Sequence, residues 1–173
     1  MNLTDVLQTP GKVMQKEEPL SLKEFSSRMG RFPITEKSPV SLTITNKGEK
    51  VLLIEGETAL TVMIPCDRCL EDVPTPLQLK FEKEVDMKQT SQERIDALDE
   101  SDYIDGYNLD VDRLVYGELL VNWPAKVLCR EDCKGICNVC GQNLNHGVCG
   151  CTPTDLDPRM AKIRDIFSNY KEV

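Results

Sequence analysis

Eight cysteines constrain this chain more than any other feature, and six of them lie within residues 129–151. Their spacing is Cys-x3-Cys-x3-Cys-x2-Cys-x8-Cys-x-Cys, and a separate Cys66-x2-Cys69 pair lies upstream. A two-residue spacer lets a tight turn point two sulfurs at one metal ion. The distal segment is rich in Gly and Asn and poor in large apolar side chains. We therefore expect a bound metal to fold it, with a binding free energy on the order of 10 kcal/mol.

The first residues, MNLTDVLQTPGK, lack a basic stretch followed by an apolar one. Without such a signal we expect a cytoplasmic protein, where thiols stay reduced and clustered cysteines more often hold metal than form disulfides. The longest apolar runs, such as residues 51–54, are too short to span a bilayer, so we expect no membrane segment.

The simplest allocation of the cysteines gives each metal ion two pairs. One local set of four thiolates consists of Cys137, Cys140, Cys149 and Cys151. A second set requires distant segments to meet, and it consists of Cys66, Cys69, Cys129 and Cys133. His146, the one histidine, is an alternative ligand for the local set, although a lone histidine in a polar loop is usually exposed. The sequence thus predicts one or two structural Zn²⁺ ions.

Three other interpretations of the cysteines are weaker. The Cys133-x3-Cys137-x2-Cys140 spacing matches radical-SAM enzymes, but the 33 residues after Cys140 are too few for their large barrel. A thioredoxin-type redox pair at Cys66 and Cys69 needs a following helix to lower the thiol pKa, and a Pro-rich strand follows instead. An iron–sulfur cluster stays open because four thiolates also suit iron.

Signals of an enzyme are otherwise missing from the sequence. It contains no Gly-rich phosphate loop, no G-x-S-x-G elbow and no H-E-x-x-H motif. One histidine leaves little room for the commonest general base. We therefore expect a non-catalytic protein without a small-molecule substrate.

The net charge of -8 is concentrated between Glu93 and Asp112, where eight acids accompany one base. The rest of the chain is nearly neutral, which argues against RNA binding by bulk charge. The acidic stretch is predicted to be a solvated loop or, alternatively, a docking surface for a basic partner such as a ribosomal protein. A direct RNA-binding zinc module is a further alternative, with a small basic patch of Lys126, Arg130 and Lys134.

Apolar and polar residues alternate from Val40 onwards, which predicts an antiparallel meander of at least four strands over residues 40–86. The Cys66–Cys69 pair lies at the tip of its second hairpin. Residues 28–39 are predicted to form a connecting loop.

Asp110 is a suitable N-cap for an amphipathic helix that Pro124 ends, and its apolar face is expected to cover the sheet. A second helix is predicted to begin at Asp157-Pro158 within residues 155–170. The fold class predicted is α+β, a meander or partly closed barrel covered by a helix. Domains are expected at residues 1–124, the core, and 125–173, the cysteine-rich segment with the terminal helix.

These motifs together resemble the YceD family, bacterial and plastid proteins named for accumulation of large-subunit ribosomal RNA. The resemblance covers about residues 3–168 and is most specific in Cys66-Asp67-Arg68-Cys69-Leu70, in Cys133-Lys134-Gly135-Ile136-Cys137, and in Cys140-Gly141 with Asn143-Leu144-Asn145.

The resemblance implies a role in the synthesis, processing or stability of 23S ribosomal RNA. It implies no catalytic activity, and a ribosomal protein or a precursor of the large subunit as the partner, with contact to rRNA direct or indirect. Some branches of the family lack most distal cysteines, so metal binding is not the whole function of the family.

Overall fold

A computed structural model describes residues 1–88 and 103–151 of the chain. The chain forms two compact units. The first consists of Met1–Ile64 and Pro74–Ala125, and the second of Pro65–Val73 and Lys126–Val173. The second unit therefore contains the tip of a hairpin as well as the distal cysteines. That residues 1–124 and 125–173 form separate domains stays a prediction.

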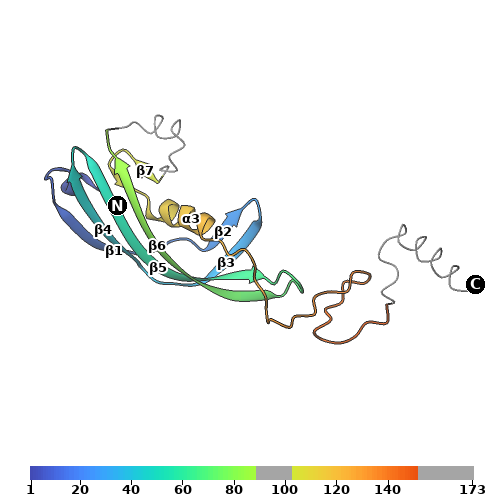
Figure 1. Ribbon diagram of the computed structural model, residues 1–173. Helices are drawn as coiled ribbons and strands as arrows, with labels where there is room; N and C mark the ends of the chain where they lie inside the picture. Colours follow the sequence, from blue (N-terminus) through green and yellow to red (C-terminus); the bar gives the residue numbers. More distant parts are fainter. Residues whose placement is uncertain (89–102, 152–173) are drawn as a thin grey trace, which may run out of the picture. The chain divides into compact units, whose positions relative to one another are not determined.

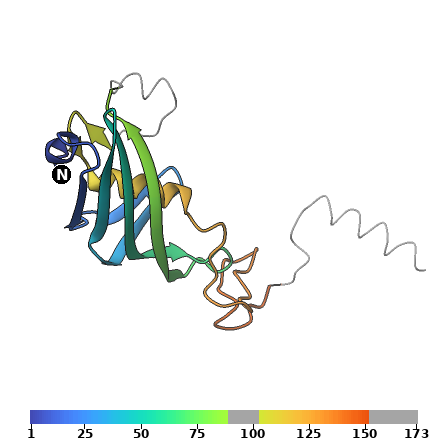
Figure 2. The ribbon, with the colours of Figure 1, turned by 60° about the vertical axis from the view of Figure 1, so that its left-hand side comes forward.

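The first unit is built on an antiparallel sheet of six strands (Figures 1 and 2). The strands are β1 (Val13–Glu18), β2 (Glu24–Ser27), β3 (Gly30–Lys37), β4 (Val40–Gly48), β5 (Val51–Pro65) and β6 (Asp72–Asp86). Their order is β1-β4-β5-β3-β2, and β6 also pairs with β5. Strand β5 is long enough to pair first with β4, at residues 51–57, and then with β3, at residues 60–62. The described strands do not close into a barrel.

Strand β5 corrects one detail of the predicted meander, because residues 40–86 form three long strands instead of four or more. The four-strand prediction needs a break within this segment, where residues 55–59 carry no large apolar side chain. Alternation continues through them, however, and Ile54, Thr58 and Leu60 are all buried on the same face. Gly56 lies on this face as well, and a Cβ there would come within 2.4 Å of the Phe81 ring. Glycine therefore leaves room for a neighbouring side chain and does not end the strand.

The predicted loop at residues 28–39 is wrong over most of its length, because Gly30–Lys37 is strand β3. Prolines at positions 33 and 39 suggested a connection. Strand β3 tolerates Pro33 opposite Glu24 of β2, and its pairing with β5 shifts register between Ile34 and Glu36. Prolines are accepted in sheets at such irregular positions, where no ladder hydrogen bond is needed.

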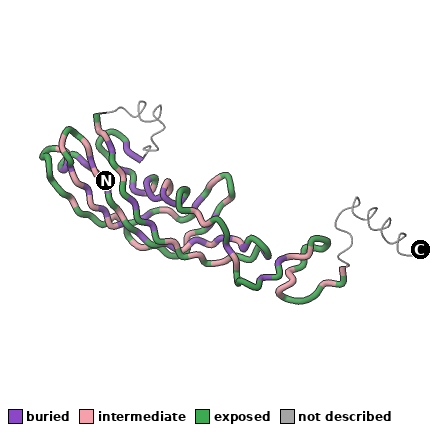
Figure 3. The backbone as a smooth tube through the Cα atoms, viewed as in Figure 1, coloured by how far each residue is buried: buried purple, intermediate pink, exposed green. Residues whose placement is uncertain are grey.

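Helix α3 (Val111–Val121) lies across one face of the sheet (Figure 1). The side chain of Asp110 accepts a hydrogen bond from the Arg113 N–H at 3.1 Å, which confirms the predicted N-cap. Buried stretches recur along α3 in Figure 3, as expected where one face of a helix is covered, and the most deeply buried residues are Leu114, Val115 and Leu119. The predicted cover of the sheet is therefore confirmed.

Aromatic residues pack near the end of α3, although the chain contains few of them. Trp123 lies with its ring centroid 4.6 Å from that of Phe25 and 4.8 Å from that of Phe32. Tyr116 of α3 also contacts Phe25, at 5.1 Å. These contacts join strands β2 and β3 to the helix, so the N-terminal third of the chain belongs to the core.

The chain's first residues are fixed by backbone pairing and by one buried amide. The Leu3 N–H donates to the Tyr107 oxygen at 2.8 Å, and the Leu109 N–H donates to the Met1 oxygen at 2.7 Å. Both bonds lie beside the small ladder of β7 (Ile104–Asp105) and β8 (Asn108–Leu109). Asn46 is buried, and its side-chain N–H groups donate to carbonyl oxygens that follow or end helix α1 (Thr4–Leu7). The buried amide thus supplies hydrogen bonds to carbonyl groups at the end of α1 that have no partner within the helix. This stabilises a helix that is too short to be stable alone.

The fold class is therefore α+β, an open antiparallel sheet covered by a helix, as predicted. The helix predicted over residues 155–170 and the acidic residues 93–102 lie outside the described residues. No helix in the described part of the chain has the length and apolar character needed to cross a membrane.

Candidate metal centre

Two cysteine pairs with a two-residue spacer adopt the same local backbone. In the first, the Cys66 N–H donates to the Glu71 oxygen at 2.8 Å and the Leu70 N–H donates to the Cys66 oxygen at 2.9 Å. In the second, Cys137 and Gly141 repeat both bonds at 2.8 Å. The residue after the second cysteine is left-handed in both, with φ +63° at Leu70 and +74° at Gly141. Two turns of this kind are therefore present, and we call them knuckles.

The residues between Cys66 and Cys69 explain how distant segments meet. Asp67 exchanges two hydrogen bonds with the backbone of Val127, at 2.9 and 2.7 Å. The Arg68 guanidinium donates to the Cys133 oxygen at 2.9 Å, and the Arg68 oxygen accepts from Ile136 at 3.1 Å. Asp67 and Arg68 thus hold residues 127–136 against the hairpin tip. The spacing of the cysteines alone does not predict this contact between the two segments.

The eight sulfur atoms lie in two groups of four. Site 1 consists of Cys66, Cys69, Cys129 and Cys133, and site 2 consists of Cys137, Cys140, Cys149 and Cys151. Within each group all sulfurs lie within 4.8 Å of one another. These are the two sets that the spacing predicts, and each can hold a metal ion. The role of the eight cysteines as ligands stays a prediction.

The sulfur separations in site 1 suit a single tetrahedral ion. Four sulfurs about 2.3 Å from such an ion lie about 3.8 Å from each other. The Cys66 and Cys133 sulfurs are 3.8 Å apart, and those of Cys69 and Cys129 are 3.5 Å apart. A disulfide needs about 2.05 Å, and all eight cysteines are free thiols. A cluster of several irons would push its ligands further apart, so the distances favour one ion.

The protons of the thiols are shared unequally in each site. Burial opposes ionisation of Cys66, but hydrogen bonds from the backbone of Cys69 and Arg68 outweigh it and lower its pKa to about 6. At Cys129, loss of solvent around the sulfur and contact with the Cys69 thiol raise the pKa to about 12. In site 2, backbone N–H groups lower the pKa of Cys137 to about 6, whereas contact with the Cys140 thiol and burial raise that of Cys151 to about 12. Four thiolates together therefore require a cation.

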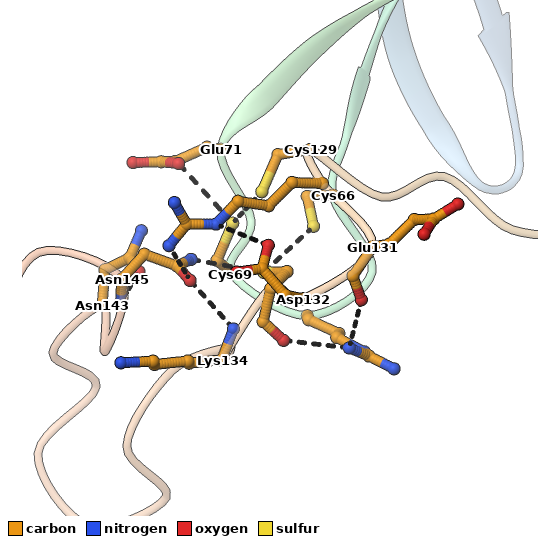
Figure 4. Close-up of polar contacts among 12 residues, drawn as sticks. Cys66, Cys69, Glu71, Cys129, Glu131, Asp132, Lys134, Asn143 and Asn145 are labelled. Atoms are coloured by element: carbon orange, nitrogen blue, oxygen red, sulfur yellow. Dashed lines mark hydrogen bonds and ion pairs between the residues drawn. The ribbon is translucent and has the colours of Figure 1, made fainter.

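The two sites differ in burial and in the hydrogen bonds that reach their sulfurs. In site 1, Cys66, Cys69 and Cys133 are buried and only Cys129 is exposed. Val73 and Leu128 pack against them, and the Asn145 side chain donates to the Cys133 sulfur at 3.2 Å (Figure 4). In site 2 the Cys137 sulfur accepts a hydrogen bond from the Val139 N–H at 3.4 Å. Site 2 is the more exposed of the two, with Cys140 exposed and Cys149 and Cys151 half-buried.

His146 is not part of either sulfur group. Its Nε2 atom lies 2.5 Å from an Oε1 oxygen of Glu71, and this hydrogen bond with the histidine lowers the pKa of the Glu71 carboxyl. The second Glu71 oxygen lies 3.6 Å from the Cys69 sulfur. His146 therefore contacts a neighbour of site 1 instead of replacing a cysteine.

The three basic residues predicted for RNA contact are exposed. The Arg130 guanidinium is already engaged, since it donates to the Asn145 side-chain oxygen at 2.7 Å and lies 3.4 Å from Asp132. The side-chain amines of Lys126 and Lys134 have no hydrogen bond or ion pair among the described residues.

Sequence reasoning missed the residues that support the sulfurs. Asn145 was noticed only as part of a motif, and Glu71 not at all. No periodicity or spacing indicates such contacts, because they depend on how two turns meet in space. The one available signal was polar residues next to cysteines, as in Cys66-Asp67-Arg68-Cys69.

Residues 54–167 match the family model described as large ribosomal RNA subunit accumulation protein YceD. The match includes all eight cysteines and helix α3.

Uncharacterised proteins of Mycobacterium bovis and Mycobacterium tuberculosis are 25% identical to this chain over 116 residues. The matched region is 67% of this chain and 56% of each relative, so the chain spans about half the length of the curated relatives that it matches. No solved structure matches the chain significantly.

Proposed function

The chain belongs to the YceD family of large ribosomal RNA subunit accumulation proteins, and on this premise we propose that it is a non-catalytic factor for the accumulation and processing of 23S rRNA. In this proposal two structural zinc ions fold the second unit, which presents a surface to the assembling large subunit. The observation that supports the metal sites is the pair of four-sulfur groups. In each group all sulfur atoms lie within 4.8 Å of one another.

Zinc is the ion proposed for both sites. Four thiolates around one tetrahedral ion form a closed site with no position for a water molecule, which is the arrangement of structural zinc. Such a site stabilises the fold and does not activate a nucleophile. Each ion would be held by the four cysteine sulfurs of its site, while Asp67 and Arg68 keep the site 1 ligands together.

The charge of the second unit favours a protein partner. Its described residues carry five acids and four bases, and a divalent ion held by four thiolates adds two further negative charges at each site. RNA binding through phosphates needs several unpaired cations on one surface. A basic ribosomal protein, or a precursor particle that contains one, is therefore the proposed partner, in the cytoplasm.

Gradient fractionation tests the proposal. Tagged protein should sediment with precursors of the large subunit, and depletion should lower 23S rRNA relative to 16S rRNA. A Cys66→Ser, Cys133→Ser variant should fail to restore 23S rRNA, whereas wild type restores it. Normal 23S rRNA after depletion, together with protein found only in the soluble fractions, would count against the proposed function.

Direct RNA binding is the second candidate, and the exposed amines of Lys126 and Lys134 are the observation that favours it. Its signature is an affinity for 23S rRNA that falls with salt and on the changes Lys126→Gln and Lys134→Gln. An affinity for 23S rRNA that does not change when both lysines are replaced would contradict direct RNA binding by this patch and leave binding to a protein partner as the proposal.

A further inference from the structure

The segment between Cys140 and Cys149 closes site 2. Gly141 at its start donates to the Cys137 oxygen at 2.8 Å, and the next residue, Gln142, accepts from the Cys137 N–H at 2.8 Å. We call residues 141–148 the bridging loop. Its ends are fixed by the cysteines of site 2, so its conformation depends on whether these four sulfurs are held together.

The bridging loop also reaches site 1, where Asn145 makes three contacts. Its side-chain N–H donates to the Cys133 sulfur at 3.2 Å, and its side-chain oxygen accepts from the Lys134 N–H at 2.8 Å and from Arg130 at 2.7 Å. Figure 4 shows this side chain reaching toward the residues of site 1 and toward Lys134. One asparagine thus fixes a ligand sulfur and the backbone directly after it.

Two further bonds join the bridging loop to the surroundings of site 1. The Leu144 N–H donates to the Gly135 oxygen at 2.8 Å, and His146 lies 2.5 Å from Glu71. Gly135 itself packs against the hairpin tip, since a Cβ there would lie 3.0 Å from the Arg68 oxygen. The loop of site 2 is therefore part of the environment of site 1.

We propose that the two metal sites are coupled through the bridging loop, so that an ion in site 2 raises the affinity of site 1 for its own ion, with Asn145 as the positioning residue. This rests on the proposed metal role of the cysteines. With site 2 empty, the loop loses its anchors and the bond from Asn145 to the Cys133 sulfur must be formed at the cost of ordering eight residues. With site 2 filled, that order already exists.

Coupling between two binding equilibria is reciprocal. An ion in site 1 must therefore raise the affinity of site 2 by the same factor. Hydrogen bonds to metal ligands typically contribute about 10- to 100-fold in metal affinity, which sets the expected size of the effect.

The test measures Co²⁺ affinity of the full chain by competition with a chelator, using the thiolate-to-cobalt absorption band. Four variants are compared with wild type: Cys149→Ser with Cys151→Ser, which disables site 2; Asn145→Ala; these three changes together; and Asn145→Asp. Asn138→Ala is the matched control, because Asn138 is an exposed asparagine of the second knuckle whose side chain has no hydrogen bond among the described residues.

We expect site 1 to bind Co²⁺ about 10-fold or more weakly when site 2 is disabled, and similarly weakly with Asn145→Ala. The triple variant should be little worse than either, since both changes remove the same contact. Asn145→Asp keeps the acceptor oxygen for Arg130 and loses the donor to sulfur, so it should also shift the absorption band. Asn138→Ala should match wild type.

Two results would overturn the coupling while leaving the zinc proposal intact: unchanged site 1 affinity with site 2 disabled, or equal effects of Asn145→Ala and Asn138→Ala. A wild-type chain that binds no Co²⁺ or Zn²⁺ would instead overturn the proposed metal sites, and the coupling with them.

Discussion

Gly56 lies in the middle of strand β5, where a glycine is required by packing and does not mark a turn. Its missing side chain leaves space for the Phe81 ring and for Leu42, which a Cβ would approach to 2.4 and 2.9 Å. We expect Gly56→Ala to destabilise the fold by about 1–3 kcal/mol through overpacking. Chemical denaturation followed by circular dichroism measures this free energy of unfolding.

Gly117 is the matched control for that substitution. It lies in helix α3, where a Cβ would meet no atom within 4 Å. Gly117→Ala should stabilise the protein by about 0.5–1 kcal/mol because alanine favours the helix. Equal effects of the two substitutions would contradict the close packing at Gly56.

Thiol protonation makes metal binding depend on pH. Cys129 and Cys151 have pKa values of about 12, so each holds a proton at pH 7 that the metal must displace, whereas Cys66 and Cys137, at about 6, are mostly ionised. Each ion should therefore release at least one proton, and its apparent affinity should rise about 10-fold or more per pH unit near pH 7. Calorimetry in buffers of different ionisation enthalpy counts the protons, and an affinity that does not change between pH 6.5 and 7.5 would contradict this.

A charged pair joins two elements, strand β6 and helix α3. The Lys83 amine lies 2.9 Å from Glu118, whose side chain is 7% exposed, while that of Lys83 is 34% exposed. Lys83→Met should lower the free energy of unfolding by about 2 kcal/mol, because it leaves the buried Glu118 carboxylate without the lysine. The loss should be smaller than for a fully buried pair, since Lys83 is partly exposed. Thermal and chemical denaturation measure the loss.

Lys80 provides the comparison on the exposed face of the same strand. It pairs with Glu57 at 3.3 Å, and both side chains are more than half exposed. Lys80→Met should change stability by less than about 1 kcal/mol. If Glu118→Leu restores the stability of Lys83→Met, the cost came from the unpaired carboxylate, and no restoration would contradict that cause.

Elements with a clear repeat were predictable from the sequence, and elements defined by long-range packing were not. Strand β4 and helix α3 follow from alternation and from the Asp110 cap. Strand β3 was missed because Pro33 within it and Pro39 after it resemble a loop, while its burial of Phe32 depends on contact with Trp123. The local group of Cys137, Cys140, Cys149 and Cys151 was readable from spacing. The meeting of the distant cysteines of site 1 and the contacts of Arg68 and Asn145 were not, since they join segments more than ten residues apart.

For the whole molecule, we propose that the first unit (Met1–Ile64 and Pro74–Ala125) and the second unit (Pro65–Val73 and Lys126–Val173) respond differently to loss of metal. The buried residues of the sheet, such as Leu42 and Ile54, need no cysteine for their packing. Chelation should therefore abolish amide protection in residues 65–73 and 126–151 and spare the sheet, as hydrogen exchange with mass spectrometry would show. Equal loss of protection in both parts would contradict this division.

Central to the proposed function is a divalent ion held by four cysteine thiolates in each site. Native mass spectrometry of protein purified without added metal tests this most directly, because it gives the identity and number of bound ions. We expect a mass higher than that of the polypeptide by two zinc ions, with both lost on acidification. A bare polypeptide whose residues 126–151 remain protected from exchange, or a mass that corresponds to iron, would contradict it.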